Sequence, residues 1–438
     1  MTQVPSAGFG AHIRRRAQRA HVADRMLTKS WLVRTFLALH GTALVVLLPQ
    51  IAVGRAIGDL PLYRDWAMAA FGGQGVIGLE ADWVYPLLAW LPIGAANLLG
   101  ARLYLLLWFA MTAGLNWWAL WVVSDGARSR HGMLAGYTAM LGFLLLSPVA
   151  LLRLEGITGP LVVIALVWLT RRPLVSGALL AVATWIKVWP ALVIGAIIAV
   201  RRERWPIIAA GVAVTAATAT ISAASGGLAH LFSFLTTQSD RALQLEAPIA
   251  TPWVWMASVD FLGAHVYQNH ELATREVVGP LDGAAIVLST PVLIAAVLAI
   301  AGLVLWARRR GALDLDLLLV GSLALVAAAI VCNKVGSPQY MLWLLPIVVV
   351  GMRTPTQWWR RMTGGLLIIA LLTTLIFPIF YLPLVRLEFF PVMLLTVRNA
   401  LLVVLLAAAV VRLVHLGRRI PASRDGEVPT TTRPVTIV

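Results

Sequence analysis

Long apolar segments recur along almost the whole chain, and they constrain its fold more than any other feature. A helix needs roughly 20 apolar residues to cross a bilayer, and fewer where it is partly buried in protein. On that criterion we predict twelve membrane-spanning helices, near residues 31–53, 101–123, 133–152, 157–170, 174–187, 189–200, 206–223, 284–306, 313–332, 338–352, 364–381 and 391–412. Hydrophobic residues occupy 60% of the 438 positions, far more than in soluble globular proteins. We therefore expect an all-α integral membrane protein.

One apolar segment does not fit this count. Residues 84–99 are apolar, but the segment is short and is interrupted by Pro86 and Pro92. A thirteenth span here would place the basic connectors that follow it on alternating sides of the membrane. We therefore predict a re-entrant or interfacial helix for this segment.

The charged residues predict the orientation. With the N-terminus in the cytoplasm, the predicted cytoplasmic segments hold 25 of the 35 Lys and Arg, whereas twelve of the 19 acids lie outside. This is the bias of the positive-inside rule, so we expect a multi-pass protein of the cell membrane with both termini cytoplasmic. The formal net charge of +16 reflects this bias, and we infer no nucleic-acid partner from it.

The chain divides into three parts by composition. We predict a basic cytoplasmic tail at 1–30, a membrane domain at 31–412, and a cytoplasmic, disordered tail at 413–438. The first tail precedes an apolar run longer than the core of a signal peptide, which favours an uncleaved anchor. Two outer loops of the membrane domain are long, at 54–100 and 224–283.

The first outer loop gathers four carboxylates, Asp59, Asp65, Glu80 and Asp82, on one side of the membrane. We find no nucleotide-binding glycine loop, and a group-transfer enzyme that works outside has no access to cytoplasmic nucleotide sugars. Its activated donor must therefore come from the membrane, and a polyprenyl-phosphate sugar is the obvious candidate. Such chemistry needs a carboxylate for the acceptor proton, cations for the donor phosphate and a groove for the lipid.

Three basic residues lie on the predicted outer side, where a donor phosphate would bind. Lys187 and Lys334 lie at the outer ends of predicted helices, and Arg241 lies in the second long loop. Lysines at helix ends also extend to the membrane interface without any function, so each alone is equally consistent with a structural role. These three residues lie on the outer side of the membrane, however, where the positive-inside rule disfavours Lys and Arg.

Five short motifs follow one another in a family-specific order: GDLPLYRDW, WVYP, SGALLAVATWIKVWPALV, QSDRALQLEAP and KVGSPQYMLWLLP. In this order they resemble the bacterial membrane glycosyltransferases of type C, particularly family 87. The resemblance runs from about Asp59 to Tyr340. It implies a polyprenyl-phosphate-mannose-dependent mannosyltransferase of the kind found in actinobacterial envelopes.

The resemblance also implies roles for individual residues. The acid of the first loop, the family's catalytic base, corresponds to Asp59. Eight other residues, in the matching motifs or in the same loops, are expected to bind substrate. They are Asp65, Tyr85, Lys187, Arg241, Glu246, Lys334, Gln339 and Tyr340. Two departures bear on acceptor specificity, because Leu87 stands where a second proline is expected and Ala247 where a serine is expected.

The similar enzymes act by direct displacement with inversion, in which one carboxylate suffices as base. The acceptor is expected to be an envelope glycolipid or glycan. Asp59 has a structural alternative, since Asp before Leu60-Pro61 is a common helix cap. Asp65 could be a solvated residue on an interfacial helix, and Glu80 and Asp82 fit loop-surface roles.

We expect no cofactor and no metal. His265 and His270 lie near Glu271, but two histidines and an acid in a loop are more typical of an ordinary polar segment than of a zinc site.

Two other functions fit part of the pattern. Twelve spans with both termini inside are typical of secondary transporters, including flippases for lipid-linked sugars. Against this, the two halves of the chain differ, and the ionisable residues gather at outer helix ends. An inactive, enzyme-like scaffold that binds lipid is the third interpretation.

Overall fold

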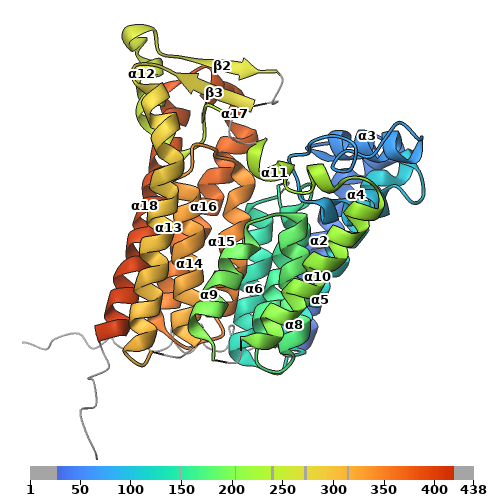
Figure 1. Ribbon diagram of the computed structural model, residues 1–438, viewed down its shortest axis with the longest axis vertical. Helices are drawn as coiled ribbons and strands as arrows, with labels where there is room; N and C mark the ends of the chain where they lie inside the picture. The colour runs from blue at the N-terminus through green and yellow to red at the C-terminus, as the bar shows by residue number, and fades with distance from the viewer. Residues whose placement is uncertain are drawn as a thin grey trace, which may run out of the picture.

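Helices running side by side make up most of the molecule, and a small sheet lies beyond one end of them (Figure 1). We call the two ends of this bundle the sheet end and the opposite end. The computed structural model describes residues 27–147, 149–202, 204–237, 241–270, 274–312 and 315–418. Most of the two predicted tails, residues 1–26 and 419–438, lies outside the described residues.

Within the described residues, six helices are long and apolar enough to cross a membrane. They are or contain α2 (Lys29–Ala52), α5 (Tyr104–Val123), α10 (Trp205–Ala224), α13 (Asp282–Arg309), α16 (Gln357–Thr374) and α18 (Phe389–Arg418). Shorter helices lie between them: α6 (Arg130–Leu145), α7 (Glu155–Trp168), α8 (Pro173–Ile186), α9 (Pro190–Val200), α14 (Leu315–Val331) and α15 (Met341–Gly351). The chain is thus a polytopic membrane protein, and each of the twelve predicted segments contains a helix. That all twelve cross the membrane stays a prediction.

The first long loop forms short helices. They are α3 (Leu60–Phe71), η1 (Leu87–Ala89) and α4 (Trp90–Ala96). Together η1 and α4 cover only about ten residues, or roughly 15 Å of helix, which is half of the hydrocarbon thickness of a bilayer. The segment 84–99 is therefore helical over a short length, and its re-entrant or interfacial placement stays a prediction.

The second long loop corrects the all-α prediction. It contains a three-stranded antiparallel sheet of order β1-β3-β2, built from β1 (Leu243–Gln244), β2 (His265–Asn269) and β3 (Thr274–Val278). Helix α12 (Thr251–Ser258), between β1 and β2 in the chain, packs on the sheet, whereas α11 (Ser233–Thr236) precedes β1 and contacts Trp83 of the first loop. The strands contain three Val, whose branched side chains suit a pleated surface, but runs of two to five residues are too short to recognise by periodicity.

Side chains and prolines set the helix starts. Thr28, Ser129 and Thr356 each cap a helix by accepting a hydrogen bond from a backbone N–H of the first turn. Pro173 and Pro190 begin α8 and α9, where the missing N–H of proline costs nothing. Pro378 has the reverse effect after α16: the predicted helix 364–381 ends at Thr374, and an irregular turn, η7 (Leu375–Ile379), leads into α17 (Tyr381–Val385).

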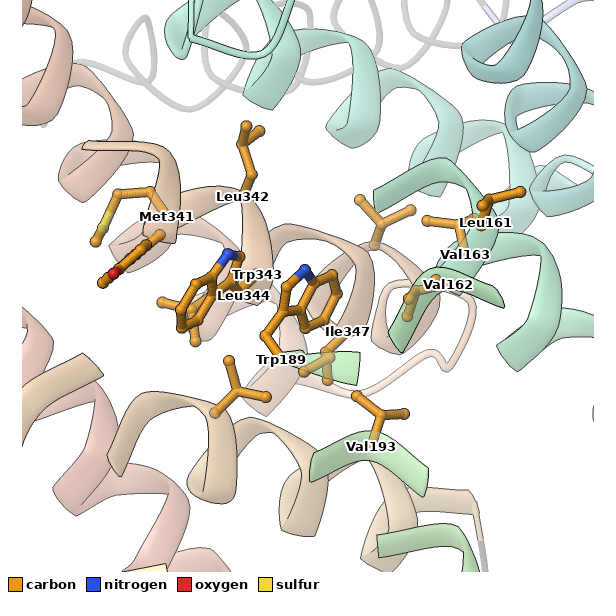
Figure 2. Packing of buried hydrophobic residues seen from close by; sticks show 14 of the residues in the cluster. Leu161, Val162, Val163, Trp189, Val193, Met341, Leu342, Trp343, Leu344 and Ile347 are labelled. Atoms are coloured by element: carbon orange, nitrogen blue, oxygen red, sulfur yellow. The ribbon is translucent and has the colours of Figure 1, made fainter. Parts of the chain in front are cut away.

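Aromatic packing joins the end of α8 to the start of α15. Trp189, which precedes α9, stacks on Trp343 of α15 with ring centroids 6.2 Å apart, next to Leu161–Val163 of α7 (Figure 2). Both tryptophans are almost fully buried. Because Trp189 is two residues from Lys187, this contact fixes the end of α8 against the start of α15.

Candidate active site

Asp59 and Arg153 form an ion pair at the sheet end of the bundle. The carboxylate of Asp59 accepts a hydrogen bond from the guanidinium of Arg153, which lies in the connection between α6 and α7. Asp59 occupies the position before α3, but its side chain makes no capping hydrogen bond, so the capping alternative does not describe it. Burial raises the pKa of Asp59, and the charge of Arg153 offsets only part of that rise.

A second ion pair lies beside the first. The ammonium of Lys187, at the end of α8, is 3.4 Å from the carboxylate of Glu155, the first residue of α7. The Lys187 nitrogen also lies 4.3 Å from the centre of the Tyr85 ring, and the hydroxyl of Tyr85 is 3.3 Å from that of Tyr63. The two pairs interact, since Glu155 raises the pKa of Asp59 and Lys187 lowers it.

Glu246 lies two residues after β1, in the second long loop. Its backbone oxygen accepts a 2.9 Å hydrogen bond from Arg398 of α18, and the same guanidinium lies 3.8 Å from its carboxylate. Both side chains are buried, at 7% and 1% exposure. Burial raises the pKa of Glu246, and Arg398 lowers it by a smaller amount.

Backbone contacts hold this part of the loop against the connection between α14 and α15. The N–H of Gln244 donates to the backbone oxygen of Lys334, and the N–H of Gly336 donates to the side-chain oxygen of Gln244, both at 3.0 Å. A Cβ at Gly336 would lie only 2.3 Å from the backbone nitrogen of Ala247. Glycine is therefore required here for the two chain segments to meet.

A polar cavity of about 300 Å³ lies beside Asp59 and Glu246. Its lining comes from five parts of the chain: Asp59, Arg153, Gln244, Leu245, Glu246, Gln268, Thr274, Arg275, Gly336, Ser337, Pro338, Gln339, Phe377 and Tyr381. Two acids, two arginines and three glutamines in one cavity provide hydrogen-bond donors and acceptors for a polyhydroxylated ligand.

Several polar atoms of this lining are buried without a hydrogen-bond partner within the described residues. They are Nε2 of Gln244, Oε1 of Gln339 and Oε2 of Glu246, the last of which lies 3.8 Å from Arg398, and all belong to residues less than 9% exposed. Buried polar groups are nearly always hydrogen-bonded in folded proteins, and an unpaired one is costly. Their concentration around one cavity indicates a site that a polar ligand completes.

The residues predicted to bind substrate mostly converge on this region. Glu246 and Gln339 line the cavity, and Tyr85 and Lys187 lie in the neighbouring charged cluster. Of the remaining three, Tyr340 is buried and stacks on Trp343. Lys334 is also buried, and its backbone oxygen accepts from Gln244. The Nε atom of Arg241 is buried without a hydrogen-bond partner within the described residues.

The other acids of the first loop lie apart from the cavity. The side chain of Asp65 is 65% exposed and pairs with Arg64 at 3.6 Å. Glu80 accepts a hydrogen bond from the backbone N–H of Val76, and Asp82 contacts His230 at 2.6 Å. None of the three lines the cavity, so the structure gives Asp65 no contact with the predicted site.

Four prominent residues of the site escaped the sequence analysis: Arg153, Glu155, Arg275 and Tyr381. The first two had a usable signal, because LRLEG places opposite charges two residues apart between apolar segments, where a charge is expensive unless it is paired. Arg275 and Tyr381 had none, since their approach depends on the sheet and on the irregular turn after α16.

In the part of the chain that the structure describes, no three His, Cys, Asp or Glu side chains lie close enough together to hold a metal ion. That the site works without a metal stays a prediction.

Comparison with known proteins agrees with this architecture. The family model described as glycosyltransferase family 87 matches residues 83–331, more than half of the chain. The matched range contains Tyr85, Arg153, Glu155, Lys187 and Glu246. No curated protein and no solved structure matches the chain. The family match suffices for the assignment: this chain belongs to glycosyltransferase family 87, and it is a membrane-embedded glycosyltransferase by membership.

Proposed function

We propose that the protein transfers mannose from a polyprenyl-phosphate donor to a glycolipid or glycan acceptor of the cell envelope, with inversion at the anomeric carbon. The observation that carries this proposal is the polar cavity itself. The cavity is lined by the carboxylate of Asp59 and by buried polar atoms that lack hydrogen-bond partners within the described residues.

Asp59 is the proposed general base. The acceptor hydroxyl attacks the anomeric carbon, the bond from that carbon to the phosphate oxygen breaks, and the hydroxyl proton passes to the Asp59 carboxylate. Polyprenyl phosphate leaves with the bonding electron pair and needs no proton. A carboxyl group whose pKa is raised by burial suits this role, because a base works best when its pKa is close to the working pH.

Lys187 and Arg241 are the proposed partners of the leaving phosphate. Lys187 lies in the charged cluster beside Asp59, and the buried Nε of Arg241 has no partner within the described residues. Fixed cations around a leaving phosphate stabilise the charge that develops on it in the transition state. The pairing of Lys187 with Glu155 keeps the ammonium in place before the donor arrives.

Gln244, Glu246 and Gln339 are proposed to bind the hydroxyl groups of the transferred sugar. Each has a buried polar atom without a hydrogen-bond partner in the described part of the chain, and a site of this kind rejects ligands that lack the matching hydroxyl. Mannose, the polyprenyl carrier and the outward-facing orientation come from the sequence resemblance and the charge bias.

The test is transfer of radiolabelled mannose from polyprenyl-phosphate mannose to envelope acceptors in membranes that hold matched amounts of each variant. Asp59→Asn removes the base and keeps the side-chain volume. Asp65→Asn is the matched control, because it makes the same change in the same loop outside the cavity. We expect at least about a hundredfold loss for Asp59→Asn and less than a twofold change for Asp65→Asn.

The donor sugar is tested in the same assay with glucose, galactose and arabinose on the same carrier. Transfer of another sugar in preference to mannose would replace the sugar and leave the reaction class intact. Equal transfer by wild type and Asp59→Asn would remove Asp59 as the base.

A further inference from the structure

A second cavity, of about 370 Å³, lies at the opposite end of the bundle. Helix α7 connects the two sites: Glu155 begins it beside Asp59, and Trp168 ends it on the wall of the second cavity. Fourteen residues of helix correspond to roughly 20 Å, so the second cavity is separate from the candidate active site.

Three arginines from three different connections line this cavity. Arg171 lies between α7 and α8, Arg201 between α9 and α10, and Arg353 between α15 and α16, whereas Asp125 is its only carboxylate among the described residues. Within those residues the side chains of Arg171 and Arg353 make neither a hydrogen bond nor an ion pair. Among the described residues, its lining therefore holds three arginines and one carboxylate.

Arg353 is half-buried, whereas Arg171 is exposed at the mouth of the same cavity. Burial lowers the pKa of Arg353, the charge of Asp125 raises it, and the charge of Arg171 lowers it further. A half-buried charge beside a second charge of the same sign is costly unless a charge of the opposite sign compensates it. An anion between Arg171 and Arg353 would supply that compensation.

Two structural roles for basic residues at this end do not account for the arrangement. The orientation bias requires only that basic residues lie on this side, and exposed arginines such as Arg171 and Arg309 meet that need without the half-buried Arg353. Arginines also stabilise the C-terminal carbonyl groups of helices. Here the carbonyls of Trp168 and Val350 already accept backbone hydrogen bonds, from Arg172 and Arg353.

The rest of the lining indicates what kind of anion fits. Val122, Leu166 and Val350 form an apolar wall beside the arginines, and Trp168 adds an aromatic ring of the kind enriched at membrane interfaces. A soluble anion would gain nothing from this wall, whereas a phosphate attached to hydrocarbon would use both parts. Basic pockets between membrane helices are known sites for the head groups of anionic lipids.

We propose that this cavity binds the phosphate of an anionic phospholipid, with Arg171 and Arg353 as its charge partners. The bound lipid would join the connections after α7 and α15, two helices that also form the frame of the candidate active site. The proposal does not depend on the reaction that the protein catalyses. A soluble phosphate compound shares the same chemistry and is distinguished from the lipid by the test.

The test is thermal unfolding of the full chain in neutral detergent. Phosphatidylglycerol is compared with phosphatidylcholine of the same acyl chains, and glycerol 3-phosphate is the soluble arm. We expect phosphatidylglycerol to raise the Tm of the wild type by about 4 °C more than phosphatidylcholine does. Arg171→Gln/Arg353→Gln should lose most of that difference. The control Arg308→Gln/Arg309→Gln removes the same charge from the same end, outside this cavity, and should keep it.

Several outcomes would overturn the proposal. An unchanged lipid effect in Arg171→Gln/Arg353→Gln would do so, as would an equal loss in the control, which would indicate general attraction to the basic end. Stabilisation by glycerol 3-phosphate without any by phosphatidylglycerol would replace the lipid by a soluble ligand. If the double variant does not fold, native mass spectrometry of the wild type decides: one phosphatidylglycerol should remain bound under activation that removes phosphatidylcholine, and equal retention of both would contradict the proposal.

Discussion

The carboxylate of Asp59 is hydrogen-bonded to the guanidinium of Arg153 across 94 positions of sequence. The contact joins the start of α3 to the connection between α6 and α7, so it closes the first long loop onto the bundle. It also holds the carboxylate of the proposed base in one orientation, with its side chain only 26% exposed. Arg153 is thus the proposed positioning residue for Asp59.

The first prediction concerns the pH dependence of transfer. A carboxylate base works only when it is unprotonated, so kcat/KM falls about tenfold for each pH unit below its pKa. Burial raises the pKa of Asp59 and Arg153 lowers it, so Arg153→Gln should move the acid limb of the pH profile to higher pH. At neutral pH we expect a loss of about 10- to 100-fold in kcat/KM that partly recovers at alkaline pH.

Arg55→Gln is the control for this prediction, since Arg55 is an exposed residue near the same loop. Its pH profile should match that of the wild type. An equal loss at every pH in Arg153→Gln would show that Arg153 does not act through the ionisation of Asp59.

The second prediction separates the structural and functional roles of Lys187. Glu155 and Lys187 are buried, with side-chain exposures of 1% and 14%. Removing one member of a buried ion pair leaves an uncompensated charge and costs roughly 3–5 kcal/mol, whereas replacing both by apolar residues is often neutral. We expect Glu155→Gln and Lys187→Met each to lower the Tm, and Glu155→Met/Lys187→Met to restore it.

Transfer activity should not recover with stability in the double variant, because the donor phosphate would still lack its cation. Thermal unfolding and the mannose-transfer assay on the same preparations measure the two effects. Full activity in the stable double variant would exclude Lys187 from phosphate binding.

The helices could be predicted from the sequence because their signal is local. Apolar runs, together with Pro173 and Pro190 at helix starts, mark segments that the structure forms as helices. The small sheet could not, since β1 has two residues and its pairing of Leu243 with Val277 depends on chain segments far apart. The helix end at Thr374 was missed although Pro378 signals it.

The same limit applies to the site. Asp59, Lys187 and Glu246 are predicted as site residues because motifs in a recognisable order carry them. A charge between two apolar runs, such as Arg153, usually needs a partner, but that partner, Asp59, lies 94 positions away in the sequence. Asp65 lies in the same loop as Asp59, but its side chain is exposed on helix α3 and pairs with Arg64.

The third prediction concerns Gly336. A methyl group there would lie 2.3 Å from the backbone nitrogen of Ala247, which cannot move without breaking the hydrogen bonds of Gln244. Gly336→Ala should therefore destabilise the protein by about 2–4 kcal/mol and displace Glu246 from the cavity wall. Thermal unfolding measures the first effect, and an increased KM for the donor measures the second.

Gly365→Ala is the matched control. Gly365 lies within α16, and a methyl group there would meet nothing within 4 Å. The change should leave KM unaltered and raise stability by up to about 1 kcal/mol, because alanine favours a helix more than glycine does. Equal effects of the two substitutions would contradict the argument from close approach.

The last prediction concerns the orientation of the two ends in the membrane. Gln74 is exposed in the loop after α3 at the sheet end, and Gln357 is exposed at the start of α16 at the opposite end. In a Cys332→Ala background, which removes the single native thiol, Gln74→Cys and Gln357→Cys each provide one labelling site without changing the charge. A membrane-impermeant maleimide should label Gln74→Cys in intact cells and Gln357→Cys only after permeabilisation.

The arginine-rich connections, including those of Arg171 and Arg353, lie at the opposite end, and basic loops remain in the cytoplasm because their translocation is disfavoured. The reverse labelling pattern would place the candidate active site in the cytoplasm, and the argument for a donor delivered by the membrane would then lose its basis.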